Sequence, residues 1–151
     1  MTLLLISIAV ALTAWWLSTG AVIYLDGLPR RTFPWTMVAA TLLMGVGIAL
    51  VWGTRHGSSV GSAYLSFLGG FLVWVWQEVS FYTGYVTGPR KHACAPGCRG
   101  WGHFGHALQV SLWHELAILV SAGVLWVAVG PGTNQVGFWA FVILWVMHES
   151  A

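Results

Sequence analysis

Charge is scarce in this sequence: Asp, Glu, Lys and Arg make up 7% of its 151 residues, and the net charge is only +2. Soluble domains carry about 25% charged residues, so a globule of this size could not cover itself with polar surface. The few Lys and Arg fall between long apolar runs. This composition excludes an ordinary soluble enzyme, a disordered tail and a nucleic-acid-binding protein. It predicts that lipid surrounds most of the chain.

Cysteines and common catalytic motifs are also scarce. Two cysteines cannot form a disulfide framework. The sequence contains neither a P-loop nor an H-E-x-x-H motif. We therefore expect a protein that is not an enzyme, and an enzyme working inside the membrane is kept as an alternative below.

Long apolar runs dominate what is present, since 58% of the residues are hydrophobic. Runs longer than about 18 residues predict transmembrane helices. The sequence therefore predicts an all-α, polytopic membrane helix bundle that forms a single membrane domain over residues 1–151. About five transmembrane helices are expected, near 2–25, 35–53, 59–85, 107–129 and 137–151. The fifth run has only about 15 residues, against about 20 for a full span.

Basic residues are distributed unequally among the loops. Five of the six lie in the loops near 26–34 and 86–106, and Arg55 lies in the loop between them. The positive-inside rule places loops rich in Lys and Arg in the cytoplasm. We therefore expect a cytoplasmic loop over 86–106 and a periplasmic N-terminus.

Small residues recur at every fourth position in the second and third spans. They are Gly45, Ala49 and Gly53, followed by Ser62, Ser66 and Gly70. Small side chains at this spacing let helix backbones approach closely in lipid. We expect both stripes to form helix contacts.

Three of the four acidic residues lie inside predicted helices. Each has a polar neighbour: the pairs are Gln77-Glu78, His114-Glu115 and His148-Glu149. A charged carboxylate at mid-bilayer costs about 2.5–3.5 kcal/mol to insert. Their depths along the spans predict one polar cluster in the cytoplasmic half of the bundle, where Glu78 and Glu115 could share a proton.

Three interpretations of this cluster stay open. It could provide interhelical hydrogen bonds, worth about 0.6 kcal/mol each. It could bind a cofactor, with neutral His114 ligating the magnesium of a bacteriochlorophyll or the iron of a haem. It could be a metal or proton-relay site. That site would use His114, Glu115, His148, Glu149 and Glu78.

The loop over 86–106 contains a second group of residues that can bind metals. Cys94, Cys98, His103 and His106 are of types that bind zinc. Their spacing is not that of a standard zinc finger, and Pro96-Gly97 predicts a turn between the cysteines. Reduced cytoplasmic thiols are therefore favoured over a metal site.

Eleven tryptophans exceed what interface belts require. Those on predicted helices are Trp74, Trp76, Trp113, Trp126, Trp139 and Trp145. They could pack against the faces of tetrapyrroles or carotenoids, or they could anchor and fill a lipid-facing surface.

Several segments together resemble a known family. They are 15–20 (WWLSTG), 25–30 (LDGLPR), 78–84 (EVSFYTG), 86–90 (VTGPR), 114–117 (HELA), and 134–137 (NQVG) leading to 144–147 (LWVM). In these segments the chain resembles the PuhE-type photosynthetic complex assembly proteins of purple and related phototrophic bacteria. Relatives continue past the point that matches Ala151. Gln77 and His148 depart from the His and Arg expected in many of them.

The resemblance implies an accessory membrane subunit or assembly factor of the photosynthetic reaction centre–light-harvesting 1 complex, which acts by helix and pigment packing. It implies the bacterial inner, intracytoplasmic photosynthetic membrane as the location. The implied partners are reaction-centre and light-harvesting 1 polypeptides and membrane lipids, with no nucleic acid. The cofactor stays unknown, with bacteriochlorophyll or carotenoid at the helix surfaces as candidates. The alternatives are an intramembrane enzyme, proton or metal site on Glu78, His114 and Glu115, or a purely structural scaffold.

Overall fold

A computed structural model describes residues 1–94 and 97–150 of the chain. Its elements in order are α1 (Thr2–Asp26), a 3-10 turn η1 (Arg30–Thr32), α2 (Phe33–Thr54), α3 (Val60–Tyr82), α4 (Gly100–Val129) and α5 (Val136–Glu149). The described residues contain no strand, so the all-α prediction is confirmed. The predicted turn at Pro96-Gly97 includes Pro96, which lies outside the described residues.

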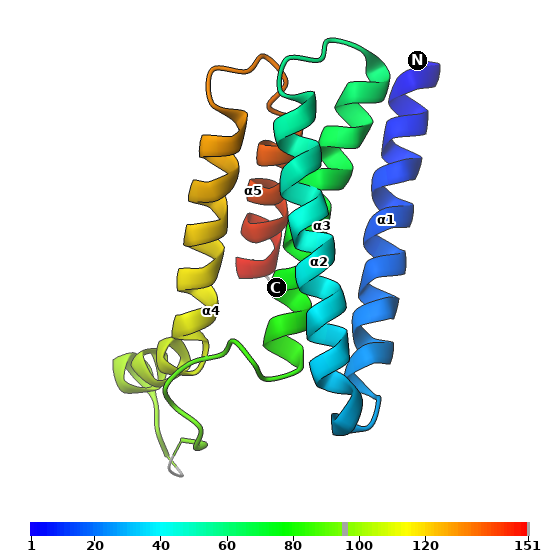
Figure 1. Ribbon diagram of the computed structural model, residues 1–151. Coiled ribbons are helices and arrows are strands. Elements are labelled where there is room, and N and C mark those ends of the chain that lie inside the picture. The colour runs from blue at the N-terminus through cyan, green and yellow to red at the C-terminus, as the bar shows by residue number, and fades with distance from the viewer. Residues whose placement is uncertain (95–96, 151) are drawn as a thin grey trace.

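The helices run up and down side by side, and α3 lies at the centre of the bundle (Figure 1). It contacts each of the other four helices. The first four helices are long and apolar enough to cross a membrane, whereas α5 has 14 residues. The protein is thus a multi-pass membrane helix bundle. Its loops near 26–34 and 83–99 lie at one end, and the other two loops lie at the opposite end.

The core fills the space that α2, α3, α4 and α5 enclose. Its buried residues are Val51, Val73, Trp74, Ile118, Leu125, Val129 and Phe141. Helix α1 lies outside this core, and Val22 is its buried residue. A face of α1 is therefore left to lipid or to another molecule.

Two predicted boundaries are wrong. The third span ends at Tyr82 rather than near residue 85, because the chain turns at Gly84, whose φ is +80°. Helix α4 begins at Gly100, so the last seven residues of the predicted loop 86–106 are helical. Glycines disfavour a helix there, but Trp101 and Phe104 lie one turn apart and pack edge to face at 5.9 Å.

The loop after α3 lies directly against α4. The backbone N–H of His114 donates to the carbonyl of Thr87 at 2.9 Å, and that of Arg90 donates to the carbonyl of Gln109 at 3.1 Å. A Cβ at Gly88 would collide with the backbone of α4 at Gln109. The first turns of α4 run at an angle to the rest of the helix (Figure 1), as expected where an outside carbonyl enters a helix hydrogen-bond ladder.

Glycines set the closest helix contacts. A Cβ on Gly69 of α3 would lie 2.6 Å from the carbonyl oxygen of Gly47 on α2. Gly70 meets the backbone of Gly137 on α5 in the same way, and Ser66 is buried beside it. The predicted stripe on α3 therefore does form a helix contact, through its last two residues.

The predicted stripe on α2 is wrong. A Cβ on Gly45 or Gly53 would have no atom within 4 Å, and Ala49 is exposed. The contact runs through Gly47 instead. Helix α2 carries small residues on more than one face, so spacing alone could not choose the packed face.

Asn134 joins the two loops at the end of the bundle opposite η1. Its side-chain amide donates to the carbonyls of Thr54 and Ser62 at 3.1 and 3.0 Å, and its backbone N–H donates to the carbonyl of Arg55 at 2.9 Å. The side chain is 6% exposed. Asn134 therefore positions the start of α5 against α2 and α3.

We expect Asn134→Ala to lower the free energy of unfolding by about 1–3 kcal/mol, because two partly buried carbonyls lose their donor. The midpoint of thermal unfolding in mild detergent measures this. The neighbouring Thr133 is exposed, so Thr133→Ala should stay within about 0.5 kcal/mol of the parent. Equal midpoints for both variants would show that Asn134 does not fasten the loops.

Candidate functional site in the bundle

A polar cluster lies inside the bundle, where the last turns of α3 and α5 face the middle of α4. Helix α3 provides Glu78, α4 provides His114 and Glu115, and α5 provides His148. One ligand atom from each of His114, Glu115 and His148 lies within 4.8 Å of the others. Residues far apart in sequence therefore meet at one place in an otherwise apolar bundle.

His148 pairs directly with Glu78. The Nδ1 atom of His148 lies 3.2 Å from Oε1 of Glu78. Its ring also packs against the rings of Trp74 at 5.6 Å and Phe81 at 6.5 Å between centroids. Glu78 is thus bound to His148 in the structure, rather than to Glu115 as one of the sequence-based hypotheses supposed.

His114 is the most enclosed member, with 0% of its surface exposed. Its ring lies 4.5 Å from that of Phe81 and 5.4 Å from that of His148. Within the part of the chain that the structure describes, neither ring nitrogen has a hydrogen-bond partner. An unsatisfied buried polar group costs about 1–3 kcal/mol. Such a group in a native fold suggests a role that packing does not explain.

Gln77 and Glu149 are the two other predicted members of the cluster. Gln77 is fully buried, and its amide donates to the hydroxyl of Ser121 on α4 at 2.7 Å. This bond joins α3 to α4, as expected of a structural polar contact in lipid. Glu149 lies on α5 and is exposed. Sequence reasoning missed Ser121, because a single serine in an apolar helix gives no signal of its own.

An open cleft lies between α1 and α5 and adjoins the cluster. Its first part, about 310 Å³, is lined by residues that include Ser18, Glu78 and His148. Its second part, about 610 Å³, is almost wholly apolar. The two parts have four lining residues in common, which are Trp15, Phe71, Leu144 and Met147. The cleft thus forms one elongated hollow with a polar end and an apolar end.

His148 and Glu78, not His114, line this cleft. Because His114 has no exposed surface, a macrocycle at the helix surface does not reach it in this structure. The predicted tryptophans lie in different environments. Trp74 is buried in the core and packs against Phe141 at 5.6 Å, whereas Trp139 lines the apolar end of the cleft.

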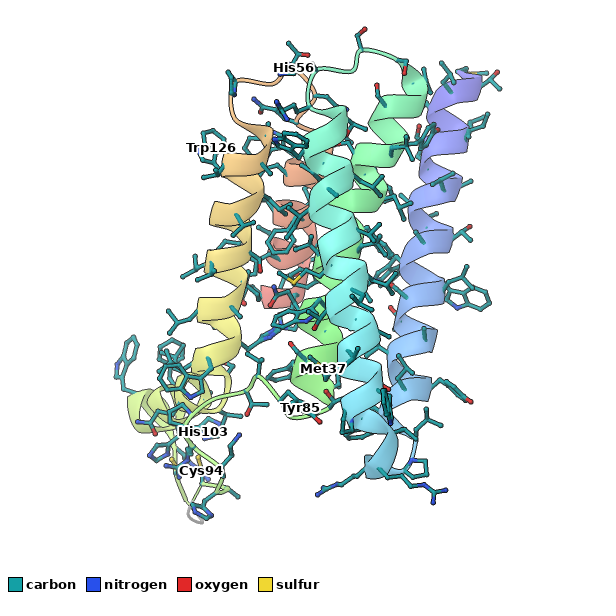
Figure 2. The ribbon with its side chains drawn as sticks, viewed as in Figure 1. Met37, His56, Tyr85, Cys94, His103 and Trp126 are labelled. Atoms are coloured by element: carbon teal, nitrogen blue, oxygen red, sulfur yellow. The ribbon has the colours of Figure 1, made fainter. Side chains whose placement is uncertain are left out.

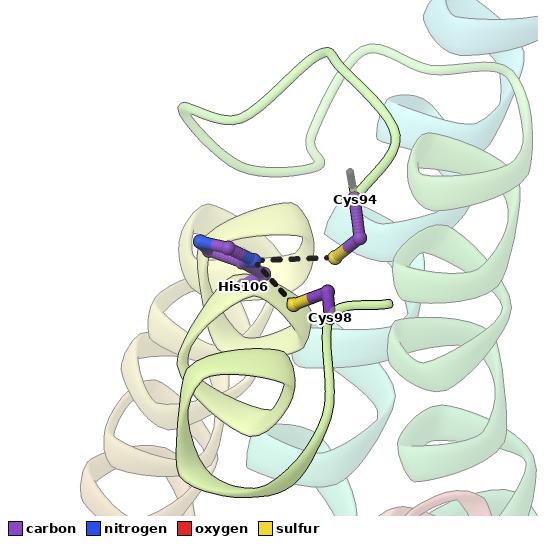
Figure 3. Close-up of side chains that lie close together, drawn as sticks. All are labelled: Cys94, Cys98 and His106. Carbon is purple, nitrogen blue, oxygen red and sulfur yellow. Dashed lines mark hydrogen bonds between the residues drawn. The ribbon is translucent and has the colours of Figure 1, made fainter. Parts of the chain in front are cut away.

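The second predicted group lies at one end of the bundle, with Cys94 and Cys98 in the loop before α4 and His103 and His106 in the first turns of that helix. Cys94 and His103 lie at the same end of the bundle as Tyr85, and His56 lies at the opposite end (Figure 2). The sulfurs of Cys94 and Cys98 lie 3.2 and 3.3 Å from Nδ1 of His106 (Figure 3). His103 is exposed and does not join them.

The Cys98 thiol has a perturbed acidity. Burial and the neighbouring Cys94 thiol raise the pKa of Cys98, and the opposing effect of Arg90 is smaller. Without a bound cation, this thiol therefore stays protonated at neutral pH.

Comparison with known proteins assigns this chain to a family. A family model described as "Protein of unknown function (DUF3623)" matches residues 1–151. The chain belongs to the DUF3623 family. A similar protein from Rhodobacter capsulatus, named "Uncharacterized 30.4 kDa protein in puhA 5'region", is 32% identical over 149 residues. The match covers 94% of this DUF3623 chain but only 54% of that protein, so the chain spans about half the length of its curated relative. No solved structure matches it.

Several segments quoted in the sequence analysis supply residues of the site in the DUF3623 chain or support the helices that carry them. Segment 78–84 supplies Glu78, and segment 114–117 supplies His114 and Glu115. Segment 86–90 lies against α4 and accepts the N–H of His114 through Thr87. Segment 134–137 holds α5 in place through Asn134. These sequence blocks therefore build the cluster and its supports.

Proposed function

We propose that this protein is an accessory protein of the photosynthetic reaction centre–light-harvesting 1 complex, either as an assembly factor or as a bound subunit. It acts in the intracytoplasmic photosynthetic membrane without catalysing a reaction, with its N-terminus in the periplasm. The relative's position in the puhA 5' region, in a photosynthesis gene cluster, supports this role. The series of segments between 15–20 and 144–147 resembles PuhE-type proteins, and this resemblance also supports the proposed role.

The observation that carries the proposal is the elongated cleft between α1 and α5. Ligand sites in proteins are mostly apolar hollows of about 300–1,000 Å³ with a few polar groups. This cleft has that form, with Glu78 and His148 at its polar end. It suits an elongated membrane pigment, bacteriochlorophyll or carotenoid, whose apolar tail lies along Phe71 and Leu144.

Co-purification tests the proposal directly. The protein is isolated through a tag in mild detergent, its absorption spectrum and extracted pigments are recorded, and its partners are identified by mass spectrometry. We expect reaction-centre and light-harvesting 1 polypeptides together with pigment. A colourless preparation without these partners would contradict the proposal.

A variant that fills the cleft tests whether the pigment binds there. Ala140 lines the apolar end of the cleft, so the indole of Ala140→Trp occupies the space of the pigment tail. We expect bound pigment to fall at least about tenfold, equivalent to about 1.4 kcal/mol of binding free energy. Val127 is 78% exposed on α4, away from the cleft, and Val127→Trp should leave pigment content unchanged. Equal pigment in both variants would place the pigment elsewhere.

The unpartnered ring of His114 favours a second candidate function, an intramembrane metal centre. His114, Glu115 and His148 offer two nitrogens and one carboxylate oxygen, a donor set that suits divalent transition metals. Glu78, whose Oε1 lies 3.2 Å from Nδ1 of His148, would orient that ring, as carboxylates do for metal-bound histidines. The variants that separate this function from pigment handling are given in the Discussion.

A further inference from the structure

Three ligand-capable atoms converge where the loop before α4 meets the first turns of that helix. The sulfurs of Cys94 and Cys98 lie 3.2 and 3.3 Å from the same nitrogen, Nδ1 of His106. All three atoms lie within 4.8 Å of one another, and all three residues are partly buried. Figure 3 shows the two cysteine side chains pointing to one edge of the imidazole ring.

Hydrogen bonding alone does not explain this arrangement. A neutral imidazole nitrogen has either one lone pair or one hydrogen, so Nδ1 makes one strong hydrogen bond. Two sulfurs at nearly equal distances exceed that capacity. Three donor atoms that face a common point are the arrangement of a cation site.

The distances fit a small tetrahedral ion. Zinc binds cysteine sulfur at about 2.3 Å and histidine nitrogen at about 2.0 Å. Tetrahedral angles then separate sulfur from nitrogen by about 3.5 Å. The observed separations are a few tenths of an ångström shorter, so the three side chains need only a small outward movement to admit the ion.

We propose that Cys94, Cys98 and His106 bind one Zn²⁺ ion, with a fourth position open to water. The ion replaces the thiol protons, because zinc ligands bind as thiolates. It links the loop to the first turns of α4. That loop also carries Thr87, which accepts the N–H of His114. Zinc therefore holds in place the segment that supports the polar cluster, whatever that cluster binds.

Metal analysis of the whole chain tests the site. The protein is purified in mild detergent under reducing conditions, metal is measured by mass spectrometry, and Co²⁺ is titrated in while thiolate-to-cobalt absorption is recorded. We expect one Zn²⁺ per chain and thiolate absorption with Co²⁺. In Cys98→Ser and in His106→Gln, metal affinity should fall at least about tenfold, since even outer-shell changes cost about 10–100-fold.

Two matched controls keep the result specific. His103 lies one turn before His106 and is exposed, so His103→Gln should bind metal like the parent. His114→Leu removes one member of the buried cluster, far from the loop cysteines in sequence, and should also leave the loop zinc unchanged. Bound zinc should protect both cysteines from a maleimide until a chelator is added.

Three results would overturn the proposal. One is free reaction of both thiols with maleimide while Zn²⁺ is present. The second is undiminished zinc in Cys98→Ser, which would place the metal elsewhere. The third is a Cys94–Cys98 disulfide in protein isolated without reductant from cells with ample zinc. None of these results bears on pigment binding in the cleft, so this inference and the proposed function fail separately.

Discussion

Replacing Gly70 with alanine should destabilise the bundle by about 3 kcal/mol, at the upper end of overpacking costs. A Cβ at this position would collide with the backbone of Gly137 on α5. Because a backbone cannot rotate away as a side chain can, α5 has to move off α3. Unfolding in mild detergent, followed by circular dichroism against temperature or denaturing detergent, measures the effect.

Gly45 provides the matched control. It lies within helix α2, as Gly70 does within α3, but a Cβ there would meet no atom within 4 Å. Gly45→Ala should therefore leave stability unchanged or raise it by about 0.4–1 kcal/mol, since alanine loses less conformational freedom on folding. If Gly45→Ala and Gly70→Ala unfold together, then close approach at Gly70 does not hold α5.

Gly70→Ala should also impair function. Displacing α5 separates His148 from Glu78, which lie 3.2 Å apart. We therefore expect Gly70→Ala to lower the yield of photosynthetic complex together with stability.

Replacing His114 with leucine should lower function without lowering stability. Both ring nitrogens of His114 are buried without a partner in the described structure, so an apolar side chain of similar size removes an unsatisfied group. Stability should stay equal or rise by about 1–3 kcal/mol. Yield of the photosynthetic complex should nevertheless fall at least about tenfold, because functional groups are commonly kept at a cost in stability. Unfolding midpoints and absorption spectra of membranes measure the two effects.

Carboxyl variants distinguish what the cluster does. Glu115→Gln keeps shape and hydrogen bonding but loses the charge. A proton relay or metal centre should fail in this variant and in His114→Leu, whereas a pigment site in the cleft, which His114 does not line, should tolerate both. Unchanged yield in Glu78→Gln, Glu115→Gln and His114→Leu would exclude a proton relay or metal centre in the cluster.

The architecture could be predicted from the sequence because lipid imposes simple rules. A backbone in hydrocarbon must satisfy its own hydrogen bonds, so each apolar run had to become a helix. The all-α multi-pass bundle follows from that rule and from the low charge. The glutamates at 78 and 115 could also be identified from the sequence as candidate site residues, because a charge inside a membrane span is costly and is seldom kept without a role.

Helix ends were harder to predict, because local and tertiary effects compete there. Glycines at 100, 102 and 105 favoured a loop, yet α4 begins at Gly100.

The face of α2 that contacts α3 could not be predicted from the sequence either. Small residues occur on several of its faces, and among its glycines at 45, 47 and 53 only Gly47 meets α3 closely.

By itself, the sequence determined the class of the protein, the number of its apolar helices and the positions of its unusual polar residues. Only the tertiary structure decided which of these residues meet. The pairing of His148 with Glu78 depends on how α5 is rotated against α3, and the glycine contact at Gly70 sets that rotation. The cleft depends on α1 and α5 lying apart along α3. Spacing along one chain specifies a face of each helix, whereas the packing between helices determines what that face touches.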